Sequence, residues 1–114
     1  MEKRSRDNAE HYVWGAGCDG WRLVDVPGLS VIEESMPAGT SEVRHFHARA
    51  RQFFFVLSGE AVLECGSERH SLAAHEGVEV PPGQVHRILN QAADSLRFLV
   101  ISAPSTRADR VNEE

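Results

Sequence analysis

The sequence is poor in the features that mark several functional classes. Lysine occurs once, at Lys3, and the formal net charge is -5. Nucleic-acid-binding domains are usually strongly basic, so we expect no nucleic-acid partner. No stretch approaches the roughly 18 apolar residues of a membrane-spanning helix. Residues 1–11 are polar and lack the apolar core of a signal peptide. We therefore expect no membrane partner and no secretion signal.

Cysteine is also scarce. Cys18 and Cys65 are the two cysteines, and they do not form a C-x-x-C motif. Two cysteines do not make a disulfide framework, so we expect reduced thiols and a cytoplasmic location. The length of 114 residues fits one domain with a modest core, to which dimerisation would add buried surface.

Sustained helical periodicity is missing, and short strands take its place. Apolar runs separated by Gly or Pro turns predict strands near residues 24–26, 29–36, 43–47, 52–57, 61–65, 78–80, 85–89 and 96–101. Such spacing is typical of an all-β sandwich or barrel. We divide the chain into an N-terminal arm (1–20), a barrel (21–103) and a polar C-terminal tail (104–114) that is mobile or wrapped over the surface. Three glycines between Trp14 and Trp21 indicate an irregular arm held by aromatic packing.

Three histidines and one glutamine stand out as candidate metal ligands. His45 and His47 are two apart on a predicted strand, so their side chains share one face. Gln52 opens the next strand, and His86 follows a Pro-Pro-Gly turn. The faces of Gln52 and His86 continue with the residues that we expect to line the pocket: Phe54, Val56, Ile88 and Asn90. Each candidate ligand therefore lies near a turn, where the mouth of a barrel would be.

The chemistry of these side chains favours one divalent transition metal ion. Imidazole suits zinc, copper, iron and nickel, and an oxygen ligand adds manganese, so the ion is Zn, Mn, Fe, Ni or Cu. Three imidazoles and an amide form a neutral ligand set, which leaves the full charge on the ion.

The spacing resembles the two motifs of the cupin superfamily, and that of a small single-domain cupin of the Cupin_2 type. The first motif falls on Gly39, His45, His47, Gln52 and Gly59, and the second on Pro81, Gly83, His86 and Asn90. The resemblance implies a double-stranded β-helix, or jelly roll, with a metal-binding barrel. The sequence departs from the motifs at Gln52, which replaces a usual glutamate, and at His75, which replaces a usual glycine. Glutamine-type small cupins include enzymes that act on uronic-acid sugars, but strand 96–101 lacks the carboxylate that they use there.

The fold hosts many activities, so several functions stay open. A metal-dependent enzyme of the isomerase/hydrolase or dioxygenase type would act on a small polar molecule such as a sugar or organic acid. The alternatives are a non-catalytic small-molecule-binding module and a barrel that has lost its metal. Glu34 is a candidate proton shuttle if its strand face is the inner one, but the catalytic residues remain unassigned. Arg44, Arg49, Arg51 and Arg87 flank the ligands and are candidates for attracting an anionic substrate. Phe53 and Phe55 lie on the opposite face from Phe54, and covering them predicts a homodimer.

Overall fold

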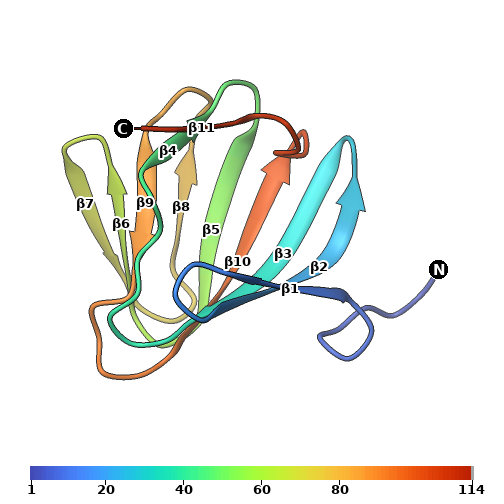
Figure 1. The fold of residues 1–114 in the computed structure, drawn as a ribbon, viewed down its shortest axis with the longest axis horizontal. Coiled ribbons are helices and arrows are strands. Elements are labelled where there is room, and N and C mark those ends of the chain that lie inside the picture. The colour runs from blue at the N-terminus through green and yellow to red at the C-terminus, as the bar shows by residue number, and fades with distance from the viewer. Residues whose placement is uncertain (114) are drawn as a thin grey trace.

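The protein folds into a jelly roll of two antiparallel sheets, as the sequence predicts (Figure 1). The structure, a computed structural model, describes residues 1–113. In chain order the strands are β1 (Glu10–Trp14), β2 (Cys18–Val26), β3 (Leu29–Met36), β4 (His45–His47), β5 (Arg51–Ser58), β6 (Ala61–Cys65), β7 (Glu68–Leu72), β8 (Gly77–Val80), β9 (His86–Leu89), β10 (Leu96–Ala103) and β11 (Arg110–Asn112). One sheet has the order β1-β2-β3-β10-β5-β8, and the other has the order β11-β4-β9-β6-β7. Residues 1–113 contain no helix with the length and hydropathy that crossing a bilayer requires.

The core lies between the inner faces of the two sheets. Met36, Leu63, Ile88 and Phe98 are fully buried there and come from strands of both sheets. Alternation along the strands produces this layer, because successive side chains of a strand point to opposite faces. At the tight turn after β5, Gly59 has a φ of 86°, and a Cβ would lie 2.6 Å from the carbonyl oxygen of Ser95. That position therefore requires glycine.

Strand β5 follows the predicted alternation. Gln52, Phe54 and Val56 are buried, whereas Phe53 is 38% exposed on the outer face. The ring of Phe53 stacks on that of Phe55, and Phe55 stacks on His75. His75 is exposed at a turn and has a φ of 68°, so it takes the left-handed conformation that the motif glycine would supply. It is a surface turn residue, and it does not line the site.

The prediction of an irregular arm before residue 21 is wrong from Glu10 onward, because β1 and β2 form a hairpin on the six-stranded sheet. Gly15 and Gly17 have positive φ values in its turn. Gly20 lies opposite Tyr12, and a Cβ there would lie 2.2 Å from Cζ of the tyrosine ring. The glycines thus serve a turn and a close ring contact. The division of the chain at residues 20 and 103 stays a prediction.

The C-terminal tail is wrapped over the barrel. Strand β11 pairs with β4, which places Arg110 opposite His47 and Asn112 opposite His45 (Figure 1). The segment is short and polar, so its sequence carries no strand pattern. Its position depends on pairing with residues more than 60 positions earlier in the chain.

Candidate metal centre

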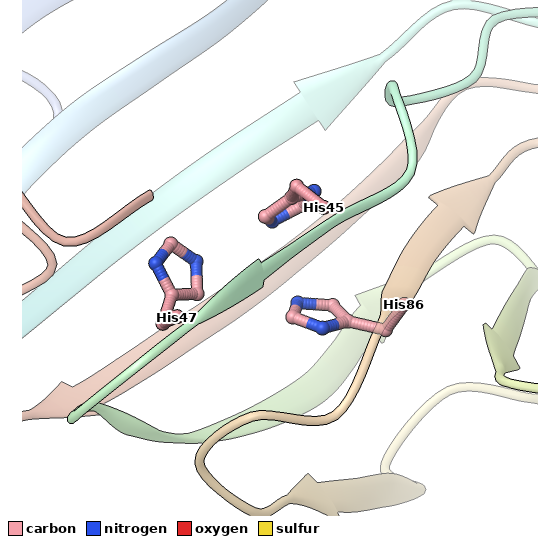
Figure 2. A group of neighbouring side chains, drawn as sticks. All are labelled: His45, His47 and His86. Carbon is pink, nitrogen blue, oxygen red and sulfur yellow. The ribbon is translucent and has the colours of Figure 1, made fainter. Parts of the chain in front are cut away.

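Three histidine side chains meet inside the barrel, near one end of β4 and β9. His45 lies directly opposite His86 in the pairing of these strands, and His47 follows on the same face of β4. The ring centroid of His45 lies 4.4 Å from that of His86 and 5.0 Å from that of His47. One nitrogen from each ring lies within 4.8 Å of the others, so the three rings can share one ion (Figure 2).

Backbone hydrogen bonds orient two of these rings. Nδ1–H of His45 donates to the carbonyl oxygen of Val43 at 2.7 Å, and Nδ1–H of His86 donates to that of Gln84 at 2.9 Å. A hydrogen bond at one ring nitrogen leaves the other nitrogen unprotonated, which is how proteins orient metal-binding histidines. The Nε2 atoms of His45 and His86 are therefore the available ligand atoms.

Several polar atoms at this centre are buried without a partner. Among the residues that the structure describes, Nδ1 of His47, Nε2 of His86 and Oε1 of Gln52 have no hydrogen bond. The amide nitrogen of Gln52 donates to Oγ of Ser102 at 3.1 Å, which leaves the amide oxygen as an acceptor. An unpaired buried polar group is costly, and a cation bound here would remove that cost. The donor set fits a divalent transition metal.

The three imidazoles are held neutral. Burial lowers the pKa of His45 to about 3 and that of His47 to about 4, with the neighbouring His86 adding to the effect at His47. Burial also lowers the pKa of His86. A neutral imidazole is the form that binds a metal, so proton competition is weak near neutral pH.

Two of the histidines, His45 and His47, open onto a small cavity of about 210 Å³, whereas His86 is buried behind them and does not line it. Its lining comes from both sheets and from the C-terminal segment: Tyr12, Arg22, Ile32, Glu34, Glu42, His45, His47, Gln52, Phe54, Val100, Ser102, Thr106 and Arg110. Phe54 is part of this lining. Val56 and Ile88 are fully buried in the core instead, and Nδ2 of Asn90 donates to the carbonyl oxygens of Met36 and Asp94. Asn90 therefore ties the end of β3 to a loop.

Glu34 faces the cavity, so the face of β3 that carries Ile32 and Glu34 is the inner one. Tyr12 O–H donates to Oε2 of Glu34 at 2.8 Å. Burial raises the pKa of Glu34 to about 7, although the hydrogen bond from Tyr12 opposes this rise. Burial and the nearby Glu34 charge raise the pKa of Tyr12, so the phenol keeps its proton.

Glu42 is a second carboxyl group of the cavity that sequence reasoning missed, and its side chain is 11% exposed. Its Oε1 accepts a hydrogen bond from the backbone N–H of Ile88 at 3.3 Å and lies 4.0 Å from Nδ1 of His45. Burial, and then the neighbouring Glu34, raise its pKa to about 8. No strand pattern points to Glu42. Tyr12 had a weak signal, since it is the one tyrosine of the chain.

The arginines of the cavity differ from those that the sequence singled out. Arg44 and Arg87 lie outside the barrel, and both pair with Glu64. Arg49 and Arg51 are exposed and pair with Asp109 and Glu79. None of these four lines the cavity, whose cationic side chains are Arg22 and Arg110.

Asp109 holds the loop that joins two ligand-bearing strands. Its buried carboxylate accepts hydrogen bonds of 3.0–3.3 Å from the backbone N–H groups of residues 48–50, between His47 and Gln52. Burial alone would raise the pKa of Asp109, but these N–H groups and Arg49 hold it below its usual range. The C-terminal segment therefore contributes to the site through Asp109 as well as through Thr106 and Arg110.

Comparison with known proteins supports the fold and the family. Residues 32–102 match the sequence model of the cupin domain family. An uncharacterized protein of Streptomyces coelicolor is 33% identical over 76 residues, which is 67% of this chain and 70% of that protein. Two other curated relatives are longer, and the chain spans 60% and 34% of their length.

Solved structures of low sequence identity share the fold. The polyketide cyclase RemF from Streptomyces resistomycificus has a TM-score of 0.85 at 18% identity, covering 100% of this chain and 86% of its own. A sugar phosphate isomerase of the cupin superfamily from Silicibacter pomeroyi has a TM-score of 0.81 at 21% identity, covering 91% and 76%. Since the family match takes in more than half of the chain and all four predicted ligands, this chain belongs to the cupin domain family.

Proposed function

We propose that this cupin is a metal-dependent enzyme of the isomerase/hydrolase or dioxygenase type that acts on a small polar molecule, such as a sugar or an organic acid. The ion, Zn, Mn, Fe, Ni or Cu, would be held by His45, His47, Gln52 and His86. Proteins of the same fold include a sugar phosphate isomerase and a nucleoside dehydratase, which supports an enzymatic function without naming the reaction.

The observation that carries this proposal is the group of unpartnered ligand atoms. Buried imidazole and amide atoms without hydrogen bonds are rare in folded proteins. Here the three histidines of β4 and β9 lie close together, and Gln52 of β5 lines the same cavity as His45 and His47. A barrel that had lost its metal would have no reason to keep them. The neutral state of the histidines supports the same conclusion.

The residues beside the ligands suit proton transfer. A bound ion would supply Lewis-acid or redox chemistry. Glu34, with a pKa of about 7, can accept or donate a proton near neutral pH. Tyr12 O–H donates to Oε2 of Glu34 and so orients the carboxyl group. Passive ligand binding needs no titrating group, so this pair favours a catalytic role.

Elemental analysis of the purified protein tests the proposal. We expect close to one equivalent of a transition metal in the wild type and none in His45→Ala/His47→Ala. Redox-active iron or copper would favour a dioxygenase, and zinc or manganese would favour an isomerase or hydrolase.

Gln52→Glu is the matched control for this measurement. It keeps an oxygen at the same position and adds a negative charge, so we expect it to retain the metal with higher affinity. Absence of metal from the wild type after reconstitution with each of the five ions would contradict the proposal. It would favour the alternative, a metal-free small-molecule-binding barrel.

A homodimer and a cytoplasmic location belong to the same proposal. The outer face of β5 and β10 presents Phe53 and Ile101 around an open depression that Arg51 and Glu79 border. A second copy of the chain is the simplest cover for such a face. Light scattering should give a mass of twice 12.6 kDa, and a monomeric mass at micromolar concentration would contradict the dimer. Cys18 and Cys65 are unpaired, which agrees with a reducing compartment.

A further inference from the structure

We infer that the substrate of this site is a small anion, and that the guanidinium group of Arg110 binds its carboxylate or phosphate group. The inference rests on the proposed function, since it concerns the ligand of the same cavity. It also assigns a role to the C-terminal segment, which lies outside both cupin motifs and outside the matched residues 32–102.

Arg110 lies at the mouth of the cavity beside the candidate ligands. It stands opposite His47 in the pairing of β11 with β4, and its side chain is 42% exposed. Arg110 lines the same cavity as Glu34, His45 and His47, and its Nη1 lies 3.8 Å from Oε2 of Glu42.

The end of the Arg110 side chain is available to a ligand. Its Nε donates to Oδ1 of Asn112 at 2.9 Å, which orients the guanidinium plane. Its Nη1 forms an ion pair with Oε2 of Glu42 at 3.8 Å, a distance at which no hydrogen bond forms. Within residues 1–113, neither Nη atom makes a hydrogen bond. A guanidinium presents its donors as a planar fork that matches the two oxygens of a carboxylate or phosphate.

Arg22 adds a second positive charge to the same cavity. Its Nε lies 3.0 Å from Oε1 of Glu10, and its guanidinium carbon lies 4.4 Å from the centre of the Tyr12 ring. The ion pair and the ring contact hold Arg22 over the Tyr12–Glu34 pair. An anion bound by Arg110 would therefore meet a second cation on the side where the candidate proton shuttle lies.

Two carboxyl groups, Glu34 and Glu42, line the cavity beside these guanidinium groups. Each already accepts a hydrogen bond: Oε2 of Glu34 from Tyr12 O–H, and Oε1 of Glu42 from the backbone N–H of Ile88. They therefore leave the Nη donors of Arg110 without an acceptor. Cationic donors gathered in a cleft attract an anionic ligand.

The size of the cavity limits the anion. Its volume of about 210 Å³ is below the range of about 300–1,000 Å³ that is usual for drug-sized ligands. The space suits a small organic acid or a small phosphorylated sugar. A nucleotide or an oligosaccharide would extend beyond it.

Titration followed by NMR tests the inference with two matched pairs of probes. Lactate is compared with its neutral isostere lactamide, and glycerol 1-phosphate with glycerol, on metal-free and on zinc-loaded protein. We expect the wild type to bind one or both anions at least tenfold more tightly than the neutral partner. The pair that shows the preference identifies the substrate group as carboxylate or phosphate.

Substitution of the arginine decides whether Arg110 causes that preference. Arg110→Gln should abolish it, and Arg110→Lys should keep part of it, because the charge remains but the fork is lost. Arg51→Gln removes an equal charge from the exposed outer face and should keep the full preference. Equal binding of anion and neutral probe by the wild type would overturn the inference. So would a preference that survives in Arg110→Gln, because another cation, Arg22 or the zinc ion, would then be the anion's partner. Metal content is measured separately, so one-to-one zinc without an anion preference would leave the proposed function standing.

Discussion

Replacing Asp109 by alanine is expected to weaken metal binding by about tenfold or more and to lower the Tm by roughly 5–10 °C. The carboxylate accepts hydrogen bonds from the backbone N–H groups of residues 48–50, and alanine would leave these groups without a partner. The loop lies between His47 and Gln52, so its loosening would misplace two ligands at once. Metal titration and thermal unfolding of the metal-free protein measure the two effects.

Two variants separate this effect from general damage to the C-terminal segment. Asp109→Asn keeps one oxygen acceptor and should fall between the wild type and alanine. Asp25→Ala removes an exposed ion pair with Arg107 that also anchors the segment, and it should change metal affinity little. If Asp109→Ala bound metal as tightly as the wild type, the loop would not depend on this carboxylate.

Replacing Glu34 by glutamine is expected to increase the stability of the metal-free protein at pH 8 relative to pH 4. The folded-state pKa of Glu34 is about 7, above the usual 4.5 that applies to the unfolded chain. Above pH 4.5 the unfolded chain therefore releases a proton that the folded protein still holds. Stability falls as the pH rises from about 4.5 to 7, by roughly 3 kcal/mol in total for this group. Glutamine does not titrate, so the variant should lack that loss.

Other groups contribute to the pH profile, so the difference between variant and wild type is the quantity to measure. Glu42, with a pKa of about 8, acts in the same direction as Glu34. The lowered pKa values of His45 and His47 act oppositely, because the unfolded chain takes up protons below pH 6.5 that the buried rings resist. Denaturant unfolding at several pH values gives the profile, and the exposed Glu79→Gln is the control. Parallel profiles for Glu34→Gln and the wild type would show that Glu34 ionises normally.

The sequence predicted the strands that carry the motifs and the face on which their side chains lie. The run 29–36 became β3 with those bounds, and β5, β6 and β10 lie where alternation or dense apolar runs indicated them. The three histidines meet as the sequence indicated. Strand periodicity and the Pro-Gly turn before His86 are local properties, so the sequence alone could reveal them. The hairpin of β1 and β2 was missed, because its glycines look like breaks until Tyr12 is seen packed against Gly20.

What the sequence determined by itself is the jelly roll, the inward side of Phe54 and the set of histidines that face one another. Only the tertiary structure decided which charged groups surround them. Arg110 and Asp109 act on residues near position 47 from the far end of the chain, and Glu42 is held by a neighbouring strand. The physical reason is that alternation reports which face a side chain takes, whereas its charged neighbours depend on how distant segments pack, which no local pattern records.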